Sequence, residues 1–178
     1  MVTYMESHDE ERVIYKALNY GNSTGNYNVR NLNTSLERLK SAGSILFLLP
    51  GPKMIWQFGE IGYDVSIDYN GRLGRKPIKW NYLNELNRKN IYNTWSYLIG
   101  LRKKHSIFSN PQSKIDTWLN NSIKKIQYSL GKENAILITN FDVITLQTSV
   151  TLPSAGHWYH ATLGEKIYIE DNELDVSI

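Results

Sequence analysis

The fold is decided by the stretch TSLERLKSAGSILFLLPGPKMIWQFG, residues 34–59. Its first half predicts an amphipathic helix because apolar side chains recur at intervals of three and four residues. These apolar positions are Leu36, Leu39, Ala42, Ile45, Leu46 and Leu49. Thr34 and Glu37 have the spacing of a capping box at the helix start. The Pro-Gly-Pro turn at 50–52 should end the helix, and the apolar run at 53–59 is typical of a buried parallel strand.

The flanking segments continue this alternation of strand and helix. Residues 1–20 predict a short strand, VTYM, then a charged turn and a helix. Residues 21–33 are rich in Gly and Asn and predict a loop, as does the polar segment from Glu60 to about Asn84. Residues 88–104 predict another helix with an apolar stripe. The order strand, helix, strand, helix predicts parallel strands covered by helices.

The pattern changes at Ser106. Short β-branched and aromatic runs follow, such as NAILITNF, HWYHA and KIYIE, and they are separated by Gly, Asn, Asp and Pro. This spacing is typical of an antiparallel β-sandwich. The sequence therefore predicts two domains, residues 1–106 and residues 107–178.

Composition excludes several classes of function. Of the 178 residues 41% are hydrophobic, which suffices for a buried core. The net charge is +3, and the Lys and Arg residues are scattered rather than gathered in a basic run. We therefore expect no nucleic-acid partner. The longest apolar stretch, SILFLLPG, is too short for a membrane span, and the absence of Cys excludes disulfides and thiol catalysis. The N-terminus has no pattern of an export signal, so the sequence leaves localisation open, including export of a bacterial parent protein.

Five segments, in order along the chain, resemble glycoside hydrolase family 13, the α-amylase family. ESHDEER at 6–12 resembles the fourth conserved region, at the end of the seventh barrel strand, and residues 38–63 are similar to the seventh helix and eighth strand. GRKPIKW at 74–80 resembles the loop after that strand, and YNTWSYLIGLRKKHSIF at 92–108 resembles the last barrel helix. The strands that follow resemble the family's domain C. The resemblance implies an α+β chain: the last β/α units of a (β/α)8 barrel over residues 1–106, then an antiparallel β-sandwich.

The resemblance also implies the site residues. Asp9 would be the catalytic transition-state stabiliser, accepting hydrogen bonds from sugar hydroxyls in subsite −1, and His8 would donate to the same hydroxyls. Arg12, in the following turn, is a further substrate-binding candidate. Trp56, Glu60 and Arg75 are added because aromatic faces stack on sugar rings and Arg and carboxylate groups hydrogen-bond sugar hydroxyls. The segment WQFGEIG carries only Glu60 where many family members have two acidic residues.

The resemblance implies a parent enzyme larger than this chain. Retaining hydrolysis needs a nucleophile and an acid about 5 Å apart, and the family takes them from its fourth and fifth barrel strands, which this chain lacks. The parent would act on α-1,4 bonds of starch-like glucans or maltooligosaccharides, by hydrolysis or transfer, without a cofactor. This chain alone should be inactive, and its uncovered barrel surface should favour self-association.

Other interpretations stay open from the sequence. Asp9 could cap the following helix, and Trp56 and Trp80 could pack beneath a long loop. His157 and His160 lie three apart on a predicted strand and so on opposite faces, which argues against a metal site.

The alternative function is a non-catalytic module. The sandwich would be a carbohydrate-binding or purely structural domain, with Trp158, Tyr159 and Tyr168 as candidate contacts. A regulatory, amylase-like interaction protein has no sequence feature in its favour.

Overall fold

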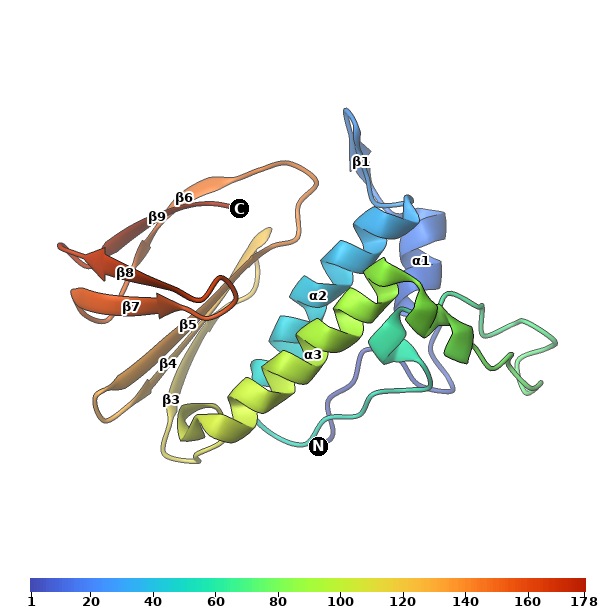
Figure 1. The fold of residues 1–178 in the computed structure, drawn as a ribbon, viewed down its shortest axis with the longest axis horizontal. Coiled ribbons are helices and arrows are strands. Elements are labelled where there is room, and N and C mark those ends of the chain that lie inside the picture. Colours follow the sequence, from blue (N-terminus) through green and yellow to red (C-terminus); the bar gives the residue numbers. More distant parts are fainter. The chain divides into compact units, whose positions relative to one another are not determined.

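The structure is a computed structural model that describes residues 1–178. The chain is α+β and divides into two units, Met1–Ser113 and Lys114–Ile178 (Figure 1). The sequence placed the boundary at residues 106–107, before the division seen here. Residues 107–113 stay with the first unit because the 3-10 helix η3 (Ser106–Phe108) buries Ile107 and Phe108 and packs against the preceding helix.

Two long helices organise the first unit, α2 (Leu32–Leu48) and α3 (Leu86–Lys104), and the shorter α1 (Val13–Tyr20) packs against α2. The buried residues of α2 and α3 lie at the predicted helical spacing, Leu36, Leu39 and Leu46 in the first and Ile91, Trp95 and Leu98 in the second. The two helices come close at Gly43, where an added Cβ would lie 2.1 Å from Nε1 of Trp95. The Trp95 indole donates to the carbonyl of Leu39 at 3.3 Å.

The start of α2 differs from the predicted capping box. The side chain of Asn31 accepts hydrogen bonds from the amides of Asn33 and Thr34, so the helix begins at Leu32. The box at Thr34 is therefore wrong, because Asn31 caps the helix three residues earlier and Thr34 lies inside its first turn. The end of the helix before Pro50 is confirmed. Arg102 of α3 stabilises that end by donating to the carbonyls of Phe47, Leu49 and Gly51.

The two parallel strands predicted in the first unit are reduced to one bridge, between Thr3 and Lys53. The amide of Thr3 donates to Pro52 and the amide of Met54 donates to Thr3, at 3.0 and 3.1 Å. Parallel pairs are less stable per residue than antiparallel ones, and neither segment has another strand beside it in this unit. Full barrel strands are thus not formed, and a short hairpin, β1 (Ser23–Thr24) with β2 (Tyr27–Asn28), occupies the loop expected after α1.

The segment predicted as a long polar loop contains two turns of 3-10 helix, η1 (Gly59–Ile61) and η2 (Trp80–Asn84). Phe58 and Gly62 flank η1 with φ of 59° and 68°, so the backbone makes a sharp corner directly after the bridge. A side chain at Gly62 would also collide with Leu36. No helix of the structure combines the length and the apolarity needed to cross a membrane.

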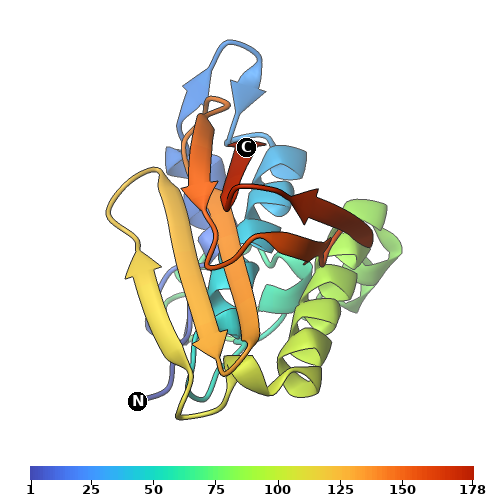
Figure 2. The ribbon, with the colours of Figure 1, turned by 90° about the vertical axis from the view of Figure 1, so that its left-hand side faces the viewer.

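The second unit is antiparallel throughout, as the sequence predicted. Its strands are β3 (Lys114–Trp118), β4 (Ile123–Leu130), β5 (Glu133–Asn140), β6 (Gln147–Thr151), β7 (Gly156–His160), β8 (Glu165–Ile169) and β9 (Glu173–Ser177). Strands β3, β4 and β5 form one sheet, seen broadside in Figure 2, and β6 pairs with β9 and β7 with β8. A core of Val150, Leu152 and Ile169 packs against side chains of β5, β7, β8 and β9.

Candidate functional site

The candidate site is built on the turn Glu6–Arg12, between the parallel bridge and α1. The buried guanidinium of Arg12 donates to the carbonyl of Ser7 at 2.6 Å. Glu6 accepts from the amide of Val13, the first residue of α1, at 2.9 Å. Glu6 therefore accepts from the first amide of α1, which is the capping role that the sequence left open for Asp9. Asp9 lies outside the helix.

The turn presents His8 and Asp9 outward. Nε2 of His8 lies 3.0 Å from Oδ2 of Asp9, and the two side chains are 71% and 69% exposed. The His8 ring is 5.9 Å from the ring of Trp56, which follows the bridge at Lys53. Three of the residues predicted as site residues are thus brought together by the two bridged segments: an imidazole and a carboxylate that face solvent, and a partly buried indole whose Nε1 is buried.

Below this group lies the buried carboxyl group of Glu6, which the sequence analysis missed. Gly59 makes room for it, because an added Cβ would lie 2.6 Å from Oε1 of Glu6. Burial raises the pKa of Glu6, the amide of Val13 and the charge of Arg12 oppose that rise, and the charge of Glu60 adds to it. The carboxyl of Glu6 therefore supports the turn from inside rather than facing a ligand.

The loop after η1 is fastened to the turn by Glu11. Its carboxylate accepts from the hydroxyl of Ser66 at 2.7 Å and from the amide of Ile67 at 2.9 Å. Arg72 of the same loop donates to the carbonyl of Asp9. Although burial opposes the change, the hydrogen bonds from Ser66, Arg12 and Ile67 lower the pKa of Glu11. A carboxylate at this position therefore joins segments more than fifty residues apart.

We expect Glu11→Ala to lower the free energy of unfolding of the first unit at pH 7 by about 1–2 kcal/mol, toward the lower end for hydrogen bonds to a charged group because Glu11 is only half-buried. Because folding lowers the pKa of Glu11, its contribution is present above the unfolded pKa and is lost as pH falls through the folded pKa. Denaturant unfolding at pH 7 and at pH 3 measures both effects. Glu37→Ala, at an exposed ion pair on α2, is the matched control. A difference from wild type that stays the same at both pH values would contradict this role of Glu11.

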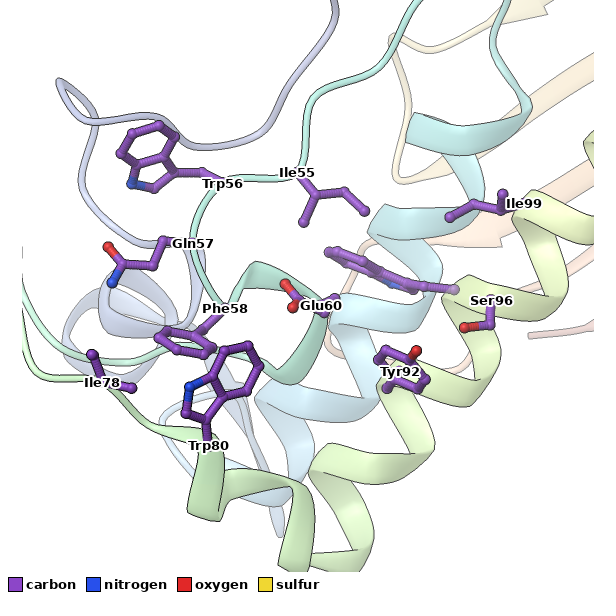
Figure 3. Close-up of a pocket in the computed structure, with 11 residues that line it drawn as sticks. Ile55, Trp56, Gln57, Phe58, Glu60, Ile78, Trp80, Tyr92, Ser96 and Ile99 are labelled. Carbon is purple, nitrogen blue, oxygen red and sulfur yellow. The ribbon is translucent and has the colours of Figure 1, made fainter.

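A pocket of about 630 Å³ opens beside the turn in the first unit (Figure 3). Trp56, Phe58 and Glu60 line it from the segment after the bridge, and α3 contributes Tyr92 and Ser96. Figure 3 shows the Glu60 carboxylate in the middle of this group. Trp80 stands at the pocket 65% exposed, with its ring edge-on to Phe58 at 4.8 Å, so it is not packed beneath the loop.

The predicted site residues do not all converge. Trp56 and Glu60 share the pocket, and Trp56 also touches His8. Arg75 lines a different depression, with Tyr69, Asn70, Lys76 and Pro77. Arg12 is 2% exposed and points at the backbone of its own turn. No group of three His, Asp or Glu side chains is placed to hold a metal ion.

The fold of this chain is similar to that of a segment of solved α-amylases. No family model matches the sequence, and no curated protein matches it. Among solved structures, an α-amylase from Anoxybacillus matches with a TM-score of 0.70 and 19% identity, over 99% of this chain and 35% of its own. The α-amylase of Geobacillus thermoleovorans, complexed with acarbose, matches with a TM-score of 0.72 and 16% identity, over 100% of this chain and 36% of its own.

A noncanonic maltogenic α-amylase from Thermotoga neapolitana also matches, with a TM-score of 0.68 and 14% identity, over 99% of this chain and 38% of its own. This chain thus has the fold of a segment of the α-amylases. It spans slightly more than a third of the length of these three structures.

Proposed function

We propose that this chain is the C-terminal part of a retaining α-glucan hydrolase or transglycosylase of glycoside hydrolase family 13. The observation that carries the proposal is the outward-facing pair His8 and Asp9, held at the carboxyl end of a bridged segment. Catalytic side chains of (β/α)8 barrels lie at the carboxyl ends of the strands. In this proposal residues 1–106 are the last β/α units of the barrel and residues 107–178 are its domain C.

Asp9 and His8 fit a role in holding a sugar rather than in cleaving it. An ionised carboxylate accepts hydrogen bonds from two neighbouring hydroxyls, and an imidazole N–H donates one. Such contacts accelerate the reaction if they tighten as the ring distorts toward the oxocarbenium-like transition state. Trp56 adds an aromatic face beside His8, and Glu60 adds a carboxylate in the neighbouring pocket, which Trp56 also lines. Arg12 acts by holding the backbone of the turn.

Solved neighbours support an α-linked glucan as the ligand. One, AmyP, is described in complex with maltose and, as its E221Q variant, with maltotriose. The Geobacillus enzyme is described with acarbose. We infer that the parent of this chain binds maltooligosaccharides, and that the chain alone does not hydrolyse them because the nucleophile and the acid come from other barrel strands.

The apolar side chains at the pocket support a covering partner in the parent protein. Ile55, Ile78 and Trp80 are 39%, 68% and 65% exposed. Monomeric proteins rarely leave neighbouring apolar side chains uncovered over a large area. In the isolated chain the same side chains favour self-association.

The test is the hydrolysis of maltoheptaose by a longer polypeptide that adds an upstream barrel, compared with the 178-residue chain. We expect Asp9→Asn to lower kcat/KM of the longer protein by at least about a hundredfold, as for other preorganised contacts to a transition state. Asp171→Asn, an exposed carboxylate in the turn between β8 and β9, should leave activity unchanged. Full activity of the Asp9→Asn enzyme would overturn the site, and hydrolysis by the short chain would overturn its incompleteness.

A further inference from the structure

The β7–β8 hairpin separates its side chains onto two faces. Its register pairs His157 with Tyr168, Trp158 with Ile167 and Tyr159 with Lys166. Since paired residues share a face and neighbours along a strand alternate, Trp158 and Ile167 lie on one face. The outer face consists of His157, Tyr159, Lys166 and Tyr168.

The inner face fixes the hairpin to the core of the second unit. Trp158 and Ile167 pack against the buried cluster of Val150, Leu152 and Ile169. The indole of Trp158 also donates to the carbonyl of Ser154 at 3.1 Å. Trp158, which the sequence offered as a carbohydrate contact, is therefore committed to packing, because alternation along β7 turns it inward. The outer face is held in place as a consequence.

The outer face is aromatic and exposed. Tyr159 and Tyr168 are 60% and 62% exposed, and the ring of His157 lies 5.0 Å from that of Tyr168. Tyr159 and Tyr168 are diagonal neighbours across the two strands, a relation that places residues about 7–8 Å apart. The two phenol rings are thus separate, adjacent surfaces, flanked by the imidazole of His157 and the ammonium of Lys166.

The chemistry of this face favours a sugar over other ligands. Every side chain on it carries a polar atom and none is aliphatic, whereas the centre of a protein interface is usually depleted of charge and desolvated. Its single lysine is a weak footprint for a polyanion. A pyranose presents C–H groups to an aromatic ring and hydroxyls at its rim, so it meets both the rings and the polar groups beside them.

We propose that this face is an α-glucan-binding platform, separate from the pair His8 and Asp9. Neighbouring glucose units stack on Tyr168 and Tyr159, and His157 and Lys166 bond their hydroxyls. The choice of an α-linked glucan rests on the proposed function. The platform itself rests on the register and exposure of the hairpin.

The test is titration of the 178-residue chain with maltoheptaose by isothermal calorimetry. We expect Tyr159→Ala and Tyr168→Ala each to weaken binding by up to about tenfold, the effect of one aromatic contact. Tyr168→Phe keeps the ring and should retain most of the affinity. Tyr20→Ala, at a 76% exposed tyrosine in α1, is the matched control and should bind like wild type. Circular dichroism checks that each variant is folded.

The outcomes separate the platform from the proposed function. Absence of binding by the wild-type chain, or wild-type affinity in both alanine variants, overturns the platform. Equal affinity for cellohexaose overturns its preference for α-linked glucose. Binding that depends on Asp9 and not on the tyrosines leaves the proposed function standing and removes the platform. Binding that depends on the tyrosines and is unchanged in Asp9→Asn supports the platform, even if Asp9→Asn leaves the longer protein active.

Discussion

Replacing Arg88 with methionine should lower the free energy of unfolding of the first unit by about 3–5 kcal/mol, the usual cost of breaking a buried ion pair. The Arg88 side chain is 3% exposed. It donates to Asp64 at 2.8 Å, to Glu85 at 2.7 Å and to the carbonyls of Ile61 and Gly62. Its guanidinium also lies 3.7 Å from the centre of the Tyr82 ring. Methionine fills much of the volume but removes the hydrogen bonds that Arg88 donates to all four of these acceptors.

The loss of Arg88 should also weaken the backbone corner beside the pocket, because Ile61 and Gly62 belong to the sharp turn after Phe58. Asp64 would keep one hydrogen bond, from the hydroxyl of Tyr82 at 2.6 Å. Burial and the neighbouring Asp64 raise the pKa of that hydroxyl, so Tyr82 remains a donor over the usual pH range.

Urea unfolding followed by tryptophan fluorescence measures the loss. Arg75→Met, at an exposed guanidinium, is the matched control and should change stability by less than about 0.5 kcal/mol. Adding Asp64→Asn to Arg88→Met should recover part of the loss, since the second change removes the uncompensated charge. A loss near that of Arg75→Met would show that the network around Arg88 contributes little.

Two helical glycines should respond to alanine with opposite signs. Alanine is favoured over glycine in a helix by about 1 kcal/mol. At Gly100, where no atom lies within 4 Å of an added Cβ, Gly100→Ala should raise stability by up to this amount. At Gly43 the Cβ would lie 2.1 Å from Nε1 of Trp95, and overpacking of this kind costs about 1–3 kcal/mol or more.

Gly43→Ala should therefore be destabilising despite its better helix propensity. The cause can be isolated in the double variant Gly43→Ala with Trp95→Phe, since the smaller ring makes room for the methyl group. In a thermodynamic cycle the double variant should lose less stability than the sum of the two single variants, which is a favourable interaction energy. Equal gains at Gly43 and Gly100 would mean that α2 and α3 are not in close contact at this point.

The sequence predicted the helices well because their stability is local and periodic. The stripe of α3, through Ile91, Trp95 and Leu98, is buried as expected. The start of α2 was missed by three residues because Asn31 competes with Thr34 as a cap, and spacing alone does not rank the two. The antiparallel strands of the second unit were predicted from short β-branched and aromatic runs separated by turn residues. The parallel strands of the first unit were not formed because a parallel strand depends on neighbours outside its own segment.

In the candidate site, too, the residues found from the sequence differ from those that depend on distant parts of the chain. His8 and Asp9 were found from the resemblance and Trp56 from the chemistry of sugar recognition, and the structure brings the three together. Glu11 was missed because its partners Ser66 and Ile67 lie far along the chain, where no local pattern marks them. Glu6 was missed for a related reason: a carboxyl in a charged turn gives no sign that it is buried under Gly59.

Lys76 lies on the loop after η1, but hydrogen bonds within the loop shield its ammonium from reagents. Its ammonium lies 2.8–3.3 Å from four carbonyls, those of Tyr69, Gly71, Arg72 and Gly74, among which its three N–H groups are shared, and so closes the loop around itself. The lone pair of a free amine attacks an acylating reagent, and this nitrogen offers a lone pair only after leaving its carbonyls and losing a proton. Chemical labelling of lysines should therefore pass over Lys76 while the loop is closed, and its modification would report the opening of that loop.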